Sequence, residues 1–299
     1  MPLAIEIRQG YINLVEASVS KNEILLKNLH HFKFDESWIN DQGVVNVDEF
    51  ANLLKTEIEK AHIKEKKVTI CINNNSIIYR EILLPEVDER KIPLLVRSEM
   101  MTNLNLTPDY IMDYVIIDQI TKNELTQYRL FGVALPKQYI ESLINVCKSI
   151  NLKVEVIDSA ANAIVKYVKS CQVLKAKEQI IVTDVEDNYL RQYLFETDKY
   201  ALTRNNRIDE ITRKNKEEVI NNIIDNINKM IQFTYTRNST AKLSKILLTG
   251  DDENLSLIRR RVKSSLNVNC EVIHANPNVK GNHQNRYINA IGSLMRVSK

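Results

Sequence analysis

Among positions 1–75, apolar residues initially form short strand-like stretches and then recur with a helical period. Three short apolar stretches separated by turn residues predict β-strands: residues 3–8, 11–18 and 23–34. The next apolar positions recur every three or four residues and predict a helix that begins near Asn46: Phe50, Leu53, Leu54, Ile58 and Ala61. Residues 67–73 are almost continuously apolar, as in a buried strand. The pattern therefore predicts a module of three strands, a helix and a strand.

The same order returns in the second half of the chain. Three more strands are predicted at residues 179–184, 189–196 and 199–204. A long helix follows, with its apolar positions on one face: Val219, Ile220, Ile223, Ile224, Ile227, Met230 and Ile231. A buried strand, a helix, a strand and a last helix are predicted at residues 245–249, 254–265, 270–274 and 286–297. The repeat indicates a duplicated module, with coincidence as the alternative because hairpins and helices are common.

The stretch between the two copies has its own pattern of a strand, a helix and two strands. These elements are predicted at residues 76–84, 91–101, 110–118 and 127–134. Helices at 137–150 and 159–170, with a strand near 153–157, lead back to the second copy. We therefore expect three parts. Residues 1–75 and 135–175 form a first lobe, residues 76–134 form an insert subdomain, and residues 176–299 form a second lobe.

Composition narrows the classes of protein that remain. The 299 residues carry a net charge of only +3, which is far from the basic excess of a nucleic-acid-binding protein. The four cysteines are widely spread in or beside apolar stretches, so we expect buried, reduced thiols and a cytosolic compartment. The five histidines show no metal-ligand spacing. With only 6 glycines, the chain is also poor in the residue that phosphate-cradling turns need.

Neither a signal peptide nor a transmembrane helix is expected. Charged residues appear within the first eight positions, before any long apolar core. No stretch approaches the roughly 18 consecutive apolar residues that a membrane-spanning helix needs. Any association with a membrane would then depend on a partner.

The duplicated module with its insert resembles the actin-like superfamily, in its FtsA and PilM branch, and most of all the PilM family of type IV pilus assembly. Five segments carry the resemblance: residues 83–89, 113–116, 133–158, 247–250 and 287–296. The resemblance covers most of the chain and depends on order and pattern rather than on one motif. It implies a ribonuclease H-like fold of duplicated βββαβα modules that form two lobes, with a small strand–helix–strand–strand insert subdomain.

In this superfamily, two hairpin turns of the form Asp-x-Gly face each other across a nucleotide cleft. Glycine lets the backbone approach a phosphate, turn N–H groups form an anion nest, and the carboxylate holds magnesium or its water shell. The resemblance puts five residues of this chain at such positions: Glu6, Gln9, Gly10, Asp184 and Gly250.

Departures from the Asp-x-Gly pattern predict a degenerate cleft. Arg8 and Glu186 stand where glycines would be, and Tyr11 replaces a small residue. These side chains occupy space that phosphates need, and Glu186 with Asp187 would repel a triphosphate. Arg8 would either pair with a phosphate or neutralise the neighbouring acids, and we favour the second. We therefore expect no catalytic residue, no metal site and no cofactor, with weak binding of ATP and magnesium as the less favoured outcome.

The resemblance also implies a binding partner. In PilM proteins a groove between the insert and the main lobe accepts the short cytoplasmic N-terminal tail of PilN, a single-pass membrane protein. The corresponding groove candidates in this chain are Ile78, Tyr79, Ile82, Leu94, Leu95, Glu99, Tyr114 and Ile116.

The implied function is that of a scaffold rather than an enzyme. It would lie on the cytoplasmic side of the inner membrane, held there through its PilN-like partner, and would help to couple the membrane platform to the pilus motor ATPase. Contacts with that motor and with a platform protein, and a homodimer, are further expectations. The alternative is an active actin-like ATPase or a sugar-kinase-like enzyme.

Overall fold

The computed structural model describes most of the chain: residues 2–21, 23–122, 125–174, 178–186, 189–196, 198–236, 242–250, 252–273 and 276–296. The chain divides into two compact units. The larger unit contains Met1–Asp35, Leu53–Asn73 and Asn151–Lys299, and the smaller unit contains Glu36–Asn52 and Asn74–Ile150. The lobe and insert limits predicted from the sequence describe a different division and stay a prediction.

The first sheet of the larger unit has the strand order β10-β6-β1-β2-β3-β16. Its strands are β1 (Leu3–Ile7), β2 (Tyr11–Val19), β3 (Ile24–Lys33), β6 (Lys67–Ile72), β10 (Lys153–Ser159) and β16 (Val279–Lys280). β1 pairs antiparallel with β2 and parallel with β6, and β6 pairs parallel with β10. β1 and β6 lie in the middle of the sheet, which explains their almost unbroken apolar sequences.

The second sheet repeats this topology in the order β13-β12-β11-β14-β15. Its strands are β11 (Glu178–Val185), β12 (Tyr189–Glu196), β13 (Lys199–Arg207), β14 (Lys242–Gly250) and β15 (Cys270–Val272). β11 pairs antiparallel with β12 and parallel with β14, as β1 does with β2 and β6. The two sheets therefore share one strand order, and the duplication predicted from the sequence is confirmed.

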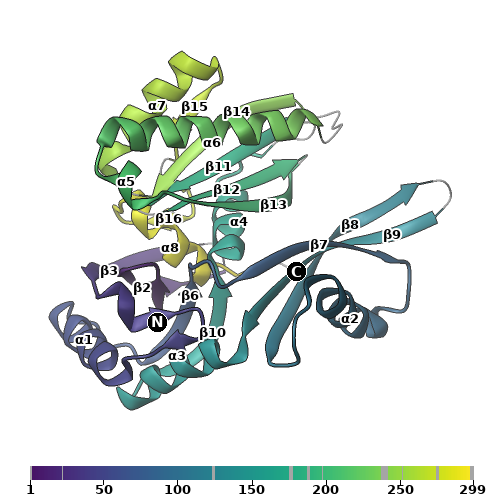
Figure 1. The fold of residues 1–299 in the computed structure, drawn as a ribbon. Helices are drawn as coiled ribbons and strands as arrows, with labels where there is room; N and C mark the ends of the chain where they lie inside the picture. The colour runs from purple at the N-terminus through teal and green to yellow at the C-terminus, as the bar shows by residue number, and fades with distance from the viewer. Residues whose placement is uncertain are drawn as a thin grey trace. The chain divides into compact units, whose positions relative to one another are not determined.

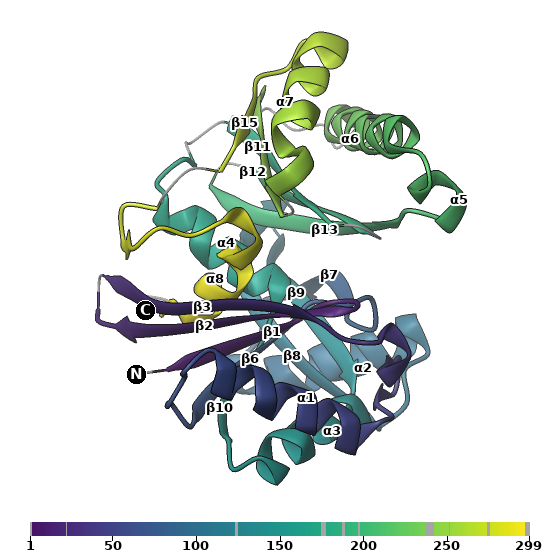
Figure 2. The same ribbon diagram turned by 90° about the vertical axis from the view of Figure 1, so that its left-hand side faces the viewer.

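Helices connect and cover the strands of the larger unit (Figures 1 and 2). They are α1 (Val47–Lys60), which begins in the smaller unit's part of the chain, α4 (Ala160–Ser170), α5 (Glu210–Arg213), α6 (Lys216–Thr236), α7 (Asp252–Leu266) and α8 (Ile288–Leu294). α4 packs against α8, and the backbones come so close that a Cβ at Gly292 would lie 2.2 Å from the carbonyl oxygen of Ala163. α8 in turn contacts β1, β2 and β6 of the first sheet.

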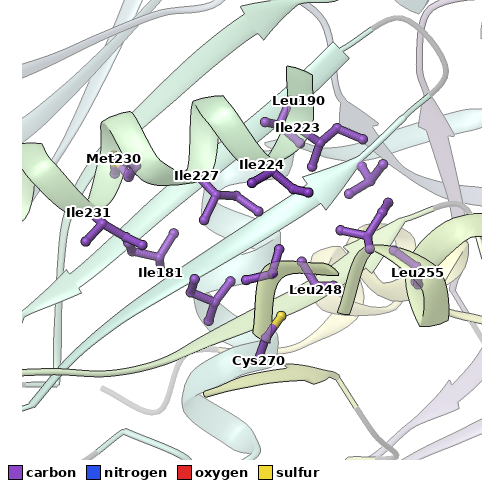
Figure 3. Packing of buried hydrophobic residues seen from close by; sticks show 14 of the residues in the cluster. Ile181, Leu190, Ile223, Ile224, Ile227, Met230, Ile231, Leu248, Leu255 and Cys270 are labelled. Atoms are coloured by element: carbon purple, nitrogen blue, oxygen red, sulfur yellow. The ribbon is translucent and has the colours of Figure 1, made fainter. Parts of the chain in front are cut away.

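The predicted apolar stripe of the long helix forms the core of the second module. In Figure 3, Ile223, Ile224 and Ile227 of α6 point toward the strands, where Ile181 and Leu190 lie. α7 and β15 add their own apolar side chains to the same cluster, including Leu255, Ile258, Val262 and Cys270. Burial of each such side chain contributes about 1.5–3 kcal/mol, so this cluster holds α6 and α7 on the sheet.

The smaller unit is built on a three-stranded antiparallel sheet in the order β7-β9-β8. Its elements are β4 (Ile39–Asn40), β5 (Gly43–Val44), β7 (Ile78–Pro85), α2 (Ile92–Leu104), β8 (Tyr110–Lys122), β9 (Leu125–Pro136) and α3 (Lys137–Ser149). α2 covers one face of this sheet through Ile92, Val96 and Met100. The strand–helix–strand–strand order is the one that the sequence predicted for the insert.

The structure also contains elements that the sequence did not predict. These are the two-residue strands β4, β5 and β16, the helix α5, and the 3-10 turns at Glu36–Trp38, Glu89–Lys91 and Asn285–Tyr287. Elements this short have no room for a hydrophobic period. The hairpin of β8 and β9 is also longer than predicted, because β8 continues to Lys122 and β9 begins at Leu125.

Candidate functional site

The turns after β1 and β11 occupy equivalent places in the two modules. After β1, the N–H of Arg8 donates to the carbonyl oxygen of Tyr11 at 3.0 Å, and Gly10 has a φ of 77° that favours glycine. After β11, the N–H of Glu186 donates to the carbonyl oxygen of Tyr189 at 2.9 Å. Asp187 and Asn188 lie outside the described residues. Each turn therefore follows the carboxyl end of a central strand, β1 in the first sheet and β11 in the second.

Arg8 connects the two turns through three carboxylates. Its Nε lies 2.6 Å from Glu6 Oε1, its Nη1 and Nη2 lie 3.4 and 3.3 Å from the two oxygens of Asp184, and Nη1 lies 2.9 Å from Glu186 Oε1. Its Nη1 also lies 3.2 Å from the hydroxyl of Tyr11. The prediction that Arg8 pairs with the neighbouring acids is therefore confirmed.

A second arginine completes the arrangement. Arg191 of β12 stands opposite Asp184 in the β11–β12 register, and its guanidinium pairs with Glu186. Its Nη2 also donates to the backbone carbonyl of Asn73, at the end of β6, at 3.4 Å. We call Glu6, Arg8, Asp184, Glu186 and Arg191 the buried charge cluster, because each is at most 3% exposed.

Three asparagines also donate hydrogen bonds to carboxylates of the cluster. Asn13 and Asn73 donate to Glu6 at 2.9 and 3.0 Å, and Asn289 of α8 donates to Asp184 Oδ2 at 3.0 Å. Both oxygens of Asp184 are therefore engaged by donors of the chain itself. A buried carboxylate with such partners avoids the penalty of an unpaired charge.

The cluster contains three carboxyl groups and two guanidinium groups, so full ionisation would leave one excess negative charge. Burial raises the pKa of Glu186 to about 7, while Arg191 and Arg8 lower it and Asp184 and Glu6 raise it. The pKa of Arg8 is raised above its ordinary value, because the attraction of Asp184 and Glu6 outweighs the effect of its burial. A proton on Glu186 thus balances the cluster near neutral pH.

Gly250 lies beside the cluster at the end of β14. Its φ is +108°, and a Cβ at this position would lie 2.1 Å from the carbonyl oxygen of Val185 and 2.7 Å from Asp184 Oδ1. Only glycine fits this close approach of β14 to β11. The structure therefore brings together Glu6, Asp184 and Gly250 of the five predicted residues, with Gly10 in the first turn and Gln9, half-buried, beside it.

The match of the chain to a family model shows which family it belongs to. The family described as "Type IV pilus assembly protein PilM" matches residues 4–209, which is more than half of the chain. The chain belongs to the PilM family. The recognition made from the sequence is confirmed, whereas no curated protein matches the chain significantly.

Solved structures show that the actin-like fold is also as predicted. A structure titled "PilM-PilN type IV pilus biogenesis complex" matches with a TM-score of 0.81 and 16% identity, covering 98% of this chain and 97% of that one. A protein of Bacteroides thetaiotaomicron "with actin-like ATPase fold and unknown function" matches with a TM-score of 0.54 and 13% identity, over 98% and 95%. The cytoplasmic domain of EpsL from Vibrio cholerae matches with a TM-score of 0.53 and 8% identity, over 98% and 94%. At such identities the likeness shows the fold alone.

The groove candidates that the PilM resemblance suggested all lie in the smaller unit. β7 carries Ile78, Tyr79 and Ile82, α2 carries Leu94, Leu95 and Glu99, and β8 carries Tyr114 and Ile116. Their contact with a peptide stays a prediction.

The PilM groove candidates differ in exposure and in the face they occupy. Leu94 is 71% exposed, whereas Ile82 is buried among the side chains between α2 and the sheet. Tyr79 lies on the face opposite to Ile82, because side chains alternate along a strand, and its ring stacks on Phe131 with centroids 5.7 Å apart. Glu99 accepts a hydrogen bond from Asn103 of its own helix. The eight residues therefore do not form a single surface.

Four residues of the site were not singled out from the sequence: Asn13, Asn73, Arg191 and Asn289. Arg191 gave the clearest signal, because it is a charged residue within the otherwise buried strand Tyr189–Glu196. Of the asparagines, Asn13 lies within β2, Asn73 follows β6 and Asn289 lies on α8. In the described part of this PilM-family chain, no helix has the length and hydrophobicity needed to cross a bilayer, and no three His, Cys, Asp or Glu side chains gather as metal ligands would.

Proposed function

We propose that this PilM-family chain is a scaffold of type IV pilus biogenesis that binds the N-terminal tail of a PilN-like membrane protein. The family match over residues 4–209 carries this proposal. The likeness in fold to a structure titled as a PilM–PilN complex supports it. The chain would be held at the cytoplasmic face of the inner membrane through that tail, and would help to couple the membrane platform to the pilus motor ATPase.

The tail would bind to the smaller unit. Leu94 on α2 and Ile116 on β8 are exposed apolar side chains. Leu95 and Tyr114 are half-buried and pack against the apolar cluster of the smaller unit. A disordered tail that becomes ordered on binding needs such apolar anchors to compensate for its lost conformational entropy. Ile78 and Ile82 would pack against this apolar cluster and would not touch the peptide.

The cleft of the larger unit would be degenerate, and the chain would not be an enzyme. Arg8 already donates to both oxygens of Asp184, the residue that would hold magnesium or its water shell. A triphosphate would have to displace this guanidinium and would meet Glu186 and Glu6 without their partner. On this proposal the residues of the site would not fit ATP with magnesium. An actin-like ATPase or a sugar-kinase-like enzyme is the rival function, supported by fold alone.

Titration calorimetry with the tail tests the proposal. The ligand is a synthetic peptide with the N-terminal cytoplasmic sequence of the PilN protein from the same genome. We expect binding to the wild-type chain and at least tenfold weaker binding to Leu94→Glu. Leu25→Glu is the matched control, because Leu25 is an exposed leucine of the larger unit. No measurable binding at about 1 mM peptide, which corresponds to only about −4 kcal/mol, would contradict the proposal.

A further inference from the structure

Among the described residues, one edge of β8 in the smaller unit has no strand partner. β8 is 13 residues long and lies at the end of the sheet β7-β9-β8, where β9 is the one described strand that pairs with it (Figure 1). Ile111, Val115, Ile116 and Ile120 of this strand are all exposed, Val115 to 54% and Ile120 to 38%. A long edge with apolar side chains is a template for pairing with another strand.

The register determines which backbone groups of β8 face its free edge. The N–H of Lys137 donates to the carbonyl oxygen of Asp109 at 2.8 Å, which makes this a hydrogen-bonded pair at the start of the β8–β9 ladder. Because such pairs alternate, residues 111, 113 and 115 direct their N–H and C=O groups to β9, and residues 112, 114 and 116 direct theirs outward. In agreement, the N–H of Tyr114 donates to the carboxylate of Asp113 at 2.8 Å.

A bulge reverses this alternation in the second half of β8. The register shifts by one residue between Ile116 and Asp118, so that Asp118 pairs with Arg129 and Ile120 with Gln127. After the shift, the odd-numbered residues Gln119 and Thr121 direct their backbone groups to the free edge. The same shift puts Ile120 on the face that carries Val115, because their partners Gln127 and Phe131 share a face of β9.

We propose that β8 pairs antiparallel with β8 of a second copy of this chain. In one two-fold register, the outward backbone groups of Tyr114 meet those of Thr121 in the second copy, and Ile116 meets Gln119. That register sets Val115 opposite Ile120 of the second copy, on the same face.

The edge is thus complementary to itself in hydrogen bonding and in apolar side chains. Each copy would cover the exposed Val115 and Ile120 of the other, and the two sheets would join into one sheet of six strands. A single pair of strands buries less than the about 1,200–2,000 Å² of a standard interface. The dimer is therefore a weak one that forms at high local concentration, such as on an assembly that gathers several copies.

Sedimentation velocity over a range of protein concentrations tests this pairing. We expect the wild-type chain to change from monomer to dimer as the concentration rises. Gln119→Pro should remain monomeric, because it removes an outward N–H that β9 does not use, which an edge strand tolerates. Gln119→Ala keeps the N–H and should dimerise like the wild type. Matching circular dichroism spectra of the two variants show that the fold is intact.

Charged side chains at the apolar pair provide a second test that does not depend on proline. Val115→Glu and Ile120→Lys should each weaken dimerisation at least tenfold, because each sets a charge opposite an apolar side chain of the second copy. The double variant, with both changes, sets opposite charges against each other and should dimerise more tightly than either single variant. A wild-type chain that stays monomeric up to about 1 mM would overturn the proposal, and so would a dimer that is insensitive to Gln119→Pro or a double variant that dimerises no better than the single variants.

Discussion

Arg8 binds Asp184 across 176 positions of the sequence, through Nη1 and Nη2 at 3.4 and 3.3 Å. Arg8 follows the first strand of the first module, and Asp184 lies near the end of the first strand of the second. In the actin-like fold these two turns are the ones that approach a nucleotide. In this chain the side chains of the two turns approach each other and form a buried ionic contact within the larger unit.

Replacement of Arg8 by alanine should strongly destabilise the larger unit. Glu6, Asp184 and Glu186 would lose their shared partner while each remains buried. Removing one member of a buried ion pair typically costs about 3–5 kcal/mol, and we expect Arg8→Ala to lie in this range by urea unfolding. Arg260→Ala, at an exposed position of α7, is the control and should change stability by less than about 0.5 kcal/mol. If Arg8→Ala lowered the free energy of unfolding as little as the control does, the ion pairs of Arg8 would not stabilise the larger unit.

Stability should depend on pH through Glu186. Its pKa in the folded chain is raised to about 7 by burial, whereas an unfolded glutamate has a pKa near 4.5. The folded state therefore holds the proton more tightly. The contribution of protonated Glu186 to the free energy of unfolding is fully present below pH 4.5. It is lost as the pH rises toward and through 7, by roughly 3 kcal/mol in total.

Glu186→Gln isolates this pH dependence. Glutamine is uncharged at every pH, so two carboxyl groups face two guanidinium groups in the variant. The difference in unfolding free energy between the variant and the wild type should grow in favour of the variant from pH 5 to pH 8. Urea unfolding at several pH values measures it. A difference that stays constant over this range would show that Glu186 does not titrate there.

Gly250→Ala should cost more stability than Gly281→Ala. Both glycines have a φ of +108°, so both substitutions impose backbone strain of about 1–3 kcal/mol. At Gly250 the new Cβ would also lie 2.1 Å from the carbonyl oxygen of Val185, whereas at Gly281 the nearest atom is a side-chain carbon of Leu26 at 3.1 Å. Thermal unfolding of the two variants compares them. Equal losses would mean that the close approach of β14 to β11 is not tight.

The modules of this fold could be predicted from sequence because their elements are long and periodic. The stripe from Val219 to Ile231 repeats for more than three turns, and it packs as α6 on the second sheet. β6 is almost continuously apolar because it lies between two other strands. The two-residue strands could not be predicted, because their pairing depends on distant segments: β16 joins β3 from the far end of the chain.

The candidate site could be predicted only in part. Arg8, Glu186 and Asp184 were found because the superfamily fixes the position of their turns. The contribution of Asn73 and Asn289 depends on how β6 and α8 are placed beside these turns, which no local pattern contains. For the smaller unit, the strand β7 was predicted from the sequence, but the bulge at Ile116–Asp118 was not.

Titration of the wild-type chain with Mg-ATP, followed by the melting temperature, tests the central claim most directly. A nucleotide at 100 times its Kd would stabilise the fold by about 2.7 kcal/mol and raise the melting temperature by several degrees. The buried charge cluster predicts no shift at millimolar Mg-ATP. A rise of several degrees that Asp184→Asn abolishes would contradict it, and would show that the two turns still hold a nucleotide.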